Sequence, residues 1–244
     1  MPQNKSAAPS GTTRSTRPLA LGAVVVVAAA LLGVVSYTAT EPDSRPAATV
    51  GQQPADDTSE TLTGLARRDA KDPLARGRAD APVVLVEYAD FQCGYCGKFA
   101  RDTEPALVKK YVEDGTLRIE WRNFPLFGAA SESAARAAWA AGEQGRFWQF
   151  HEAAYADGAK EKGFGAARLD ALAREAGVAD LDRFRDDLAG PRARAAVEKD
   201  RDEAYALGAT ATPSFLINGQ PLAGAQPEEV FVQEIEAAKA RAAK

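Results

Sequence analysis

The most extended apolar stretch of the chain lies near its N-terminus. Residues 18–40 contain no charged side chain, and residues 19–37 consist almost wholly of Ala, Val, Leu and Gly. A helix needs about 20 apolar residues to cross a bilayer, whereas a cleaved signal peptide has a shorter apolar stretch that ends in small residues. Because the run ends in Ser36-Tyr37-Thr38, a poor cleavage site, we favour an uncleaved transmembrane anchor over residues 18–38, rather than a cleaved signal or a buried core helix.

The charges that flank this run set its expected orientation. Basic residues precede it and acidic residues follow it: Lys5, Arg14 and Arg17 before, Glu41 and Asp43 after. Positive side chains stay on the cytoplasmic side of a membrane. We therefore expect a cytoplasmic tail at residues 1–17. The rest of the chain should lie outside the cytoplasm at the cell membrane, where disulfide chemistry is permitted.

Beyond the apolar run, residues 39–72 are rich in Pro, Thr and Asp and show little apolar periodicity. This composition predicts a flexible linker that holds a folded domain away from the membrane. The folded domain should then occupy residues 73–244.

Within this domain, the run Val83–Tyr88 is largely apolar and β-branched, which predicts a buried central strand. The next apolar positions recur at helical spacing, so an amphipathic helix should begin at the cysteines and be kinked at Pro105. These positions are Cys96, Phe99, Ala100, Thr103, Leu107 and Tyr111. Residues 116–121 then alternate between apolar and polar side chains, which predicts a second strand.

The second half of the domain begins with a stretch dominated by Ala, Arg, Glu and Leu, residues 129–207, which predicts a mostly helical block. Two short apolar runs follow, Ser214–Ile217 and residues 220–223. The pair Asn218-Gly219 between them is a strong hairpin signal. A last amphipathic helix should cover residues 228–243.

The order of these elements predicts an α/β fold with a mixed sheet flanked by helices. Strand–helix–strand order requires a parallel pair with a right-handed crossover, and the hairpin adds antiparallel strands. The helical block, at about residues 128–207, is too long for a connection within a compact sheet. We therefore interpret it as an inserted subdomain.

Composition narrows the function classes. The chain of 244 residues has a net charge of −4 and a pI near 5.3, without the basic surface that is typical of nucleic-acid-binding proteins. Its two cysteines are too few for a disulfide-stapled scaffold. One His and one Met leave few soft or imidazole ligands, so we expect neither a metal nor another cofactor.

The two cysteines form the motif Cys93-Gly94-Tyr95-Cys96 at the junction of the predicted strand and helix. A helix N-terminus stabilises a thiolate, which is the attacking species in disulfide exchange. Because Cys96 lies one turn further along, it can resolve a mixed disulfide formed at Cys93. We expect Cys93 to be the exposed nucleophile and Cys96 to be buried.

Three other interpretations of the pair stay open at this point: a zinc site, a structural disulfide and a chance pair of inert cysteines. A zinc site needs about four ligands, so it would have to add His151 and carboxylates. Closing so short a loop constrains the unfolded chain by only about 2 kcal/mol, which makes a purely structural disulfide a weak staple. Redox chemistry is the interpretation that we favour.

Glu87 interrupts the predicted buried strand six residues before Cys93. A buried carboxylate is costly unless it has a role or a partner, and burial raises its pKa. Glu87 is therefore a candidate proton acceptor for Cys96 when a mixed disulfide is resolved. The alternative is a solvated Glu at a strand edge.

Thr212-Pro213 directly precedes the strand Ser214–Ile217. A proline at the start of a strand is tolerated where no ladder N–H is needed. It could equally form a cis bond that places backbone opposite the cysteines, although trans is the commoner state.

The single histidine, His151, lies in an aromatic segment with Phe147, Trp148 and Phe150. A role as catalytic base is conceivable. We favour a packing or surface role, because no other candidate catalytic residue is near it in the sequence.

Taken together, these motifs resemble the DsbA-type thioredoxin family, in its membrane-anchored Gram-positive (actinobacterial-like) branch, over residues 72–243. The order and spacing of the motifs make the resemblance specific. It rests on Asp80-Ala81-Pro82, Glu87, Asp90-Phe91-Gln92-Cys93, Tyr95-Cys96-Gly97-Lys98-Phe99, Phe147-Trp148 with His151, Gly208, Thr212-Pro213-Ser214-Phe215 and Asn218-Gly219. The resemblance implies a thioredoxin fold with a helical insertion.

The resemblance also implies roles for individual residues. Cys93 exchanges disulfides with client thiols, Cys96 resolves the mixed disulfide, and Glu87 takes the place of the buried acid beneath the cysteines. Pro213 is expected to be cis, with the backbone of Thr212 beside the active-site pair and available to an extended substrate. Four residues are therefore expected to contact the substrate: Gly94, Tyr95, Thr212 and Pro213.

Members of this family act mainly as donors of disulfides to exported proteins. A quinone-linked membrane protein of the DsbB or vitamin-K-epoxide-reductase type reoxidises them. The resemblance implies the same partners here. Two alternatives stay open: a disulfide reductase or isomerase that receives electrons across the membrane, and a non-catalytic module that binds clients.

One departure from the family concerns the residues between the cysteines. The family often has Pro after the first Cys or His before the second, whereas this chain has Gly94-Tyr95. A Tyr cannot supply the positive charge of a His. Our hypothesis is that the pKa of Cys93 is less depressed, and its pair less oxidising, than in the strongest oxidants.

Overall fold

The computed structural model describes residues 62–243. The predicted cytoplasmic tail, the anchor at residues 18–38 and the linker up to residue 61 lie outside the described residues. Across residues 62–243, no helix is both long and apolar enough to span a bilayer.

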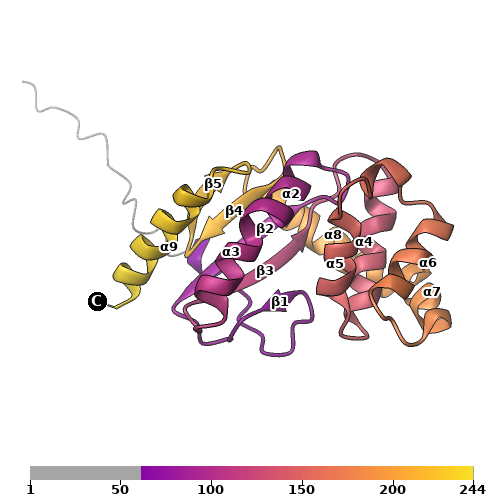
Figure 1. Ribbon diagram of the computed structural model, residues 1–244, viewed down its shortest axis with the longest axis horizontal. Helices are drawn as coiled ribbons and strands as arrows, with labels where there is room; N and C mark the ends of the chain where they lie inside the picture. The colour runs from indigo at the N-terminus through magenta and orange to yellow at the C-terminus, as the bar shows by residue number, and fades with distance from the viewer. Residues whose placement is uncertain (1–61, 244) are drawn as a thin grey trace, which may run out of the picture. The chain divides into compact units, whose positions relative to one another are not determined.

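A mixed sheet of five strands forms the centre of the described domain (Figure 1). The strands are β1 (Ala75–Arg76), β2 (Val83–Ala89), β3 (Leu117–Asn123), β4 (Ser214–Ile217) and β5 (Gln220–Ala223). They lie in the order β1-β3-β2-β4-β5, with β2 parallel to β3 and antiparallel to β4. The mixed α/β sheet that the sequence predicts is therefore confirmed, and β1 is an additional short edge strand.

The β4–β5 hairpin follows from its turn residues. Asn218 and Gly219 have φ values of 44° and 80°, the left-handed conformation that a two-residue hairpin turn requires at both central positions. Asn218 also ties the turn to β2, because its side-chain oxygen accepts from the backbone N–H of Val84 at 2.8 Å.

Helices cover the sheet and form a separate group beside it (Figure 1). They are α2 (Gly94–Lys98), η1 (Phe99–Thr103), α3 (Glu104–Leu107), η2 (Val108–Val112), α4 (Ala129–Gly142), α5 (Phe147–Tyr155), η3 (Lys160–Lys162), α6 (Ala166–Glu175), α7 (Leu181–Ala189), α8 (Pro191–Ala206) and α9 (Glu228–Ala242). The segments α2, η1, α3 and η2 follow one another without a break and form one helical rod, residues 94–112. Two of these segments, η1 and η2, are π-helical. Pro105 is the second residue of α3, between these two segments, so the predicted interruption takes the form of π-helical turns on either side of it.

The sheet is buried on both faces. On one face, Leu85 and Ile119 pack with Phe99 and Phe231, which come from η1 and α9. On the other face, Val84, Val86 and Tyr88 pack with Ala204 of α8. Burial on both faces explains why β2 is almost continuously apolar in the sequence.

Helices α4–α8 form the helical block, and its core reaches the sheet at the cysteines. The buried face of α4 consists almost wholly of Ala, which allows the neighbouring helices to approach closely. Phe91 and Trp121 belong to the same apolar cluster as these alanines and as Cys93 and Cys96. The helical block therefore supports the active-site end of the sheet.

Residues 62–72, which we assigned to the linker, contact the domain in the structure. The backbone N–H groups of Arg67 and Arg68 each donate to the carboxylate of Glu120 at 2.8 Å. Leu65 packs on the sheet face that contains Val84. Local sequence patterns do not predict this contact, because the partner carboxylate is 53 positions away from Arg67.

Candidate active site

A tight turn at the end of β2 presents Cys93. The carboxylate of Asp90 accepts from the backbone N–H of Gln92 at 2.8 Å and from that of Leu126 at 2.6 Å. The N–H of Cys93 donates to the carbonyl of Asp90 at 2.9 Å. Cys93 has an extended backbone and stands directly before α2, so its thiol lies at the start of the helical rod.

The two free cysteines differ in burial and in acidity. Cys93 is 5% exposed and Cys96 is fully buried. Cys93 is the more exposed of the two, as predicted. The expectation that Cys93 is exposed to solvent is wrong, because neighbouring backbone and side chains cover most of it. The pKa of Cys93 is lowered to about 6, chiefly by a hydrogen bond from Cys96, with help from Thr212 and backbone N–H groups. Burial raises the pKa of Cys96 well above its usual value.

Thr212 and Pro213 lie directly against the attacking thiol. The bond between them is cis, as the resemblance implies. The thiol of Cys93 donates to the carbonyl of Thr212 at 3.2 Å, so the two segments meet although 119 residues separate them. Gly94 and Tyr95 lie beside this contact and are exposed, with 68% of Tyr95 accessible.

Glu87 lies in the middle of β2, on the sheet face that the helical rod covers. Its strand neighbours are Trp121 and Phe215, and its side chain is fully buried. Neither carboxylate oxygen has a hydrogen-bond partner among residues 62–243. Burial raises the pKa of Glu87 well above its usual value, and the negative charge of Glu104 raises it further. A solvated edge position is therefore wrong for Glu87, and a protonated acid at this position can exchange a proton with Cys96.

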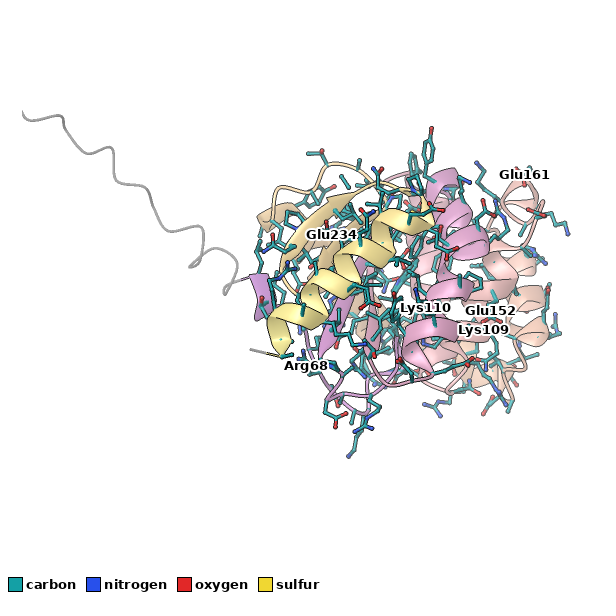
Figure 2. All side chains as sticks on the ribbon, turned by 60° about the vertical axis from the view of Figure 1, so that its left-hand side comes forward. Arg68, Lys109, Lys110, Glu152, Glu161 and Glu234 are labelled. Atoms are coloured by element: carbon teal, nitrogen blue, oxygen red, sulfur yellow. The ribbon has the colours of Figure 1, made fainter. Side chains whose placement is uncertain are left out.

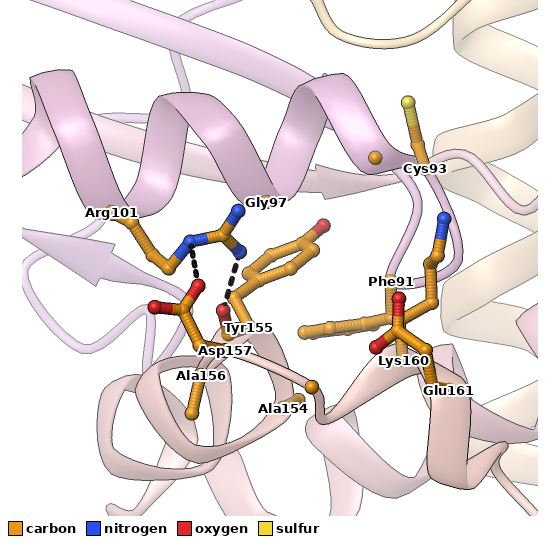
Figure 3. Close-up of a pocket in the computed structure, with 12 residues that line it drawn as sticks. Phe91, Cys93, Gly97, Arg101, Ala154, Tyr155, Ala156, Asp157, Lys160 and Glu161 are labelled. Carbon is orange, nitrogen blue, oxygen red and sulfur yellow. Dashed lines mark hydrogen bonds and ion pairs between the residues drawn. The ribbon is translucent and has the colours of Figure 1, made fainter.

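A pocket of about 170 Å³ lies beside Cys93, between the helical rod and the segment that follows α5 (Figure 3). Arg101 donates to the carbonyl of Tyr155 at 2.7 Å and pairs with Asp157 at 3.0 Å. Lys160 extends toward Cys93 in this view. The pocket has room for a side chain of a bound polypeptide next to the attacking thiol.

His151 is 1% exposed and lies among aromatic rings, so the surface role that we considered for it is wrong. Its ring centroid is 4.9 Å from that of Tyr155 and 5.2 Å from that of Trp121. Its Nε2 lies 3.9 Å from a carboxylate oxygen of Glu104. Sequence reasoning did not single out Glu104, since nothing in a helical stretch marks one Glu as buried.

Within residues 62–243, no group of three or more His, Cys, Asp or Glu side chains is placed to hold a metal ion. The groups that the structure brings together here are a thiol with a lowered pKa, a buried partner thiol and a buried acid.

Comparisons with known proteins agree with this geometry. A sequence profile of the thioredoxin family matches residues 69–237. Probable disulfide bond formation protein D of Bacillus cereus is 30% identical over 148 residues, which cover 59% of this chain and 68% of that protein. The solved structure of oxidised BdbD from Bacillus subtilis superposes with a TM-score of 0.65 at 24% identity, over 70% of this chain and 95% of that one.

A longer relative shares the same region. The Na⁺/H⁺ antiporter NhaA 3 of Salinispora tropica is 39% identical over 151 residues, which cover 59% of this chain. Those residues make up only 21% of the antiporter, so the chain spans about a fifth of that protein. The thioredoxin profile, by contrast, covers most of the folded domain. The chain belongs to the thioredoxin family, and it shares its fold with the solved structure of α-DsbA1 from Wolbachia pipientis.

Proposed function

We propose that this chain is a thiol–disulfide oxidoreductase that donates disulfides to the thiols of exported proteins through Cys93 and Cys96. The observation that carries the proposal is the asymmetry of the two thiols. Cys93 has a pKa lowered to about 6 and contacts Thr212, whereas Cys96 is buried with a raised pKa. A stable thiolate at Cys93 favours the reduced state, and that preference makes the disulfide form an oxidant.

The reaction begins with the Cys93–Cys96 disulfide. A client thiolate attacks the sulfur of Cys93, a mixed disulfide forms, and Cys96 leaves as a thiolate that takes a proton from Glu87. A second client thiolate attacks the client sulfur of the mixed disulfide and releases Cys93 as a thiolate. The client loses two electrons and gains a disulfide, and the protein gains the two electrons as a dithiol.

The substrate approach is set by the surroundings of Cys93. The exposed Gly94 and Tyr95 stand on one side of the thiol, and the cis bond before Pro213 places the Thr212 carbonyl on the other. An extended client strand can pair with backbone at Thr212 while its cysteine reaches Cys93. These contacts support the four predicted substrate-contacting residues as parts of one binding surface.

We further propose that the protein is a single-pass membrane protein whose catalytic domain lies outside the cytoplasm. The charge-free run over residues 18–38 and the basic residues before it support this location. A quinone-linked membrane protein of the DsbB or vitamin-K-epoxide-reductase type is the proposed reoxidant. Alkaline extraction of membranes tests the anchor: the full chain should stay in the membrane fraction, and a chain without residues 18–38 should not.

Thiol trapping in cells tests the direction of the reaction. The full-length chain should carry Cys93 and Cys96 mostly as a disulfide, and a Cys96→Ser variant should accumulate mixed disulfides with clients. A pair that is mostly reduced in cells would contradict the proposal and favour a reductase or isomerase. A Cys93→Ser variant with full biological activity would contradict any redox role and favour a client-binding module.

A further inference from the structure

The described part of the molecule concentrates unpaired buried polar atoms in one place. Among residues 62–243, ten buried side-chain nitrogen and oxygen atoms have no hydrogen-bond partner in the protein. Six of them come from four residues that lie beneath the helical rod: both carboxylate oxygens of Glu87, Oε1 of Glu104, Nε1 of Trp148, and Nδ1 and Nε2 of His151. Such atoms are rarely left without partners in folded proteins, so the concentration calls for a physical explanation.

These four residues come from three elements, and Arg76 adds a fourth. Glu87 is on β2, Glu104 on α3, Trp148 and His151 on α5, and Arg76 on the edge strand β1. Arg76 Nε lies 3.9 Å from Oε1 of Glu104, and His151 Nε2 lies 3.9 Å from its other carboxylate oxygen. These separations are longer than hydrogen bonds, yet each brings two polar groups into one small volume.

Bridging water would account for the distances and for the unpaired atoms together. A buried water needs two to four polar partners, and Glu87, Glu104, Trp148 and His151 each carry an atom that lacks one. Trp148 Nε1 adds a donor at the same place, because the guanidinium of Arg76 stacks over the Trp148 ring at 3.6 Å. Polar contacts beyond hydrogen-bond range are commonly completed by water in this way.

The cluster also leads from the active site to the surface. Exposure of the side chains rises in steps from 0% at Glu87 to 4% at Glu104 and 18% at Arg76. Arg76 then pairs at 3.6 Å with Glu152, which is 69% exposed and is labelled in Figure 2. At the inner end, Glu87 interacts electrostatically with both cysteines. A negative charge on Glu87 raises the pKa of Cys96, and a negative charge on Cys93 raises the pKa of Glu87.

We propose that Glu104 and His151 line a hydrated proton path that connects Glu87 with the solvent. The path rests on the proposed function, because it serves the proton that Cys96 takes up or gives off at each turnover. When Cys96 leaves as a thiolate, it takes the Glu87 proton, and solvent replaces that proton through water held by Glu104 and His151. When the pair is reoxidised, the same proton travels outward, so no proton is created or lost.

The other groups around the cluster fit this assignment. Burial lowers the pKa of His151 well below its usual value, so its ring is neutral and can accept a proton on one nitrogen while it donates from the other. Burial raises the pKa of Glu104, which allows it to pass a proton near neutral pH. Tyr155 also contacts His151, but its hydroxyl donates to the carbonyl of Asp90 at 2.9 Å and is not available.

Infrared spectroscopy of the reduced full-length protein tests the path directly. A buried carboxylic acid gives a C=O band that shifts in D₂O when its proton exchanges, and Glu87→Gln identifies the band of Glu87. We expect exchange within the mixing time in the unaltered protein and in the control Asp102→Asn. In Glu104→Gln, exchange should be slower by about 100-fold, the lower end of what a positioned acid or base contributes to proton transfer.

Asp102→Asn is a matched control, because Asp102 is an exposed carboxylate on the same helical rod that pairs with Lys98. Equal exchange rates in Glu104→Gln and the unaltered protein would overturn the path. So would exchange over hours in the unaltered protein, or the absence of any band that Glu87→Gln removes. Should Glu104→Gln not fold, His151→Phe removes both ring nitrogens and is expected to slow exchange as well, and an equal rate there overturns the path too.

A kinetic measurement separates the path from a change in electrostatics. Glu104→Gln should slow oxidation of a dithiol peptide by about tenfold or more, with a larger solvent isotope effect, while the pH profile of Cys93 alkylation stays in place. A parallel shift of the alkylation profile and the oxidation rate would overturn the path in favour of a charge effect. If the unaltered protein does not oxidise the peptide, the proposed function fails, and the infrared result still decides the path.

Discussion

Glu87 and Glu120 are both fully buried, on neighbouring central strands of one sheet, yet their surroundings are opposite. Glu120 accepts hydrogen bonds from the guanidinium groups of Arg118 and Arg122, at 2.8 and 2.9 Å, and from two backbone N–H groups. Its pKa is lowered to about 2, because these partners outweigh the effect of burial. Within the part of the chain that the structure describes, Glu87 has no hydrogen-bond partner, and burial raises its pKa.

The difference shows what burial alone says about a carboxylate. An acid that is saturated with donors is held ionised and serves the structure, because moving its proton would cost all of those interactions. An acid without donors can change its protonation state at little cost to its neighbours. The face of the sheet decides which case applies: Glu120 faces the segment around Arg67, whereas Glu87 faces Cys96 and the helical rod.

The largest effect should come from removing the structural acid. Glu120→Leu leaves Arg118 and Arg122 buried without their carboxylate, so we expect it to lower the free energy of unfolding by about 3–5 kcal/mol. Urea unfolding followed by circular dichroism measures this. A loss below about 1 kcal/mol would mean that Glu120 is not the centre of the network.

The functional acid should behave in the opposite way. Glu87→Gln keeps the shape of the side chain but cannot carry the proton, so we expect oxidation of a dithiol peptide to slow by about 100-fold, with little loss of stability. The control Glu132→Gln, a half-buried carboxylate on α4 that pairs with Arg201, should leave the rate unchanged. A Glu87→Gln variant that is destabilised as strongly as Glu120→Leu would remove the distinction between the two acids.

The two acids should also give stability opposite pH dependences. The raised pKa of Glu87 means that its contribution is complete below about pH 4.5 and is lost as pH rises toward its folded value. The lowered pKa of Glu120 means that its contribution is present above about pH 4.5 and is lost as pH falls toward about 2. In Glu87→Gln, the free energy of unfolding, measured between pH 2 and pH 9, should therefore fall less on the alkaline side than in the unaltered protein. A steeper alkaline fall would contradict the assignment.

The smallest change concerns the thiols. Alkylation of the reduced protein by iodoacetamide should reach half its maximum rate near pH 6 and should modify Cys93 alone, because only this thiol is ionised there. A midpoint near pH 8.5, the value of a free cysteine, would contradict the site geometry.

Titration against glutathione extends this test to the redox potential. A pKa of about 6 at Cys93 is less depressed than the value near 3.5 of the strongest oxidants, in agreement with the Gly94-Tyr95 hypothesis. We expect a potential more reducing than about −120 mV. A value as high as −120 mV would contradict the hypothesis.

Local patterns predict much of this fold, because its strands and turns depend on residues that are close in the sequence. The strand at Val83–Ala89, the Asn218-Gly219 turn and the positions of the cysteines all follow from neighbouring side chains. The pattern of β3 is less informative. Alternation is typical of a strand with one wet face, but all seven residues of β3 are buried, because Arg118, Glu120 and Arg122 satisfy one another.

The parts of the site that could not be predicted depend on distant contacts. His151 and Glu104 are 47 positions apart, and only the packing of α5 against the helical rod brings them together. The burial of Cys93 depends on Thr212, which is 119 positions away. Glu87 could be singled out because a charge in an apolar strand is conspicuous, whereas a buried Glu in a helix rich in charged residues is not.

Single-turnover oxidation tests the central claim most directly. The oxidised full-length protein is mixed with an equal amount of a reduced peptide that carries two cysteines, and mass spectrometry follows both partners. The account predicts that the peptide gains one disulfide as the Cys93–Cys96 disulfide is lost. A Cys96→Ser variant, with Cys93 first converted to a mixed disulfide with a small thiol, should form a mixed disulfide between Cys93 and the peptide. A peptide that stays reduced while the Cys93–Cys96 disulfide persists would contradict it.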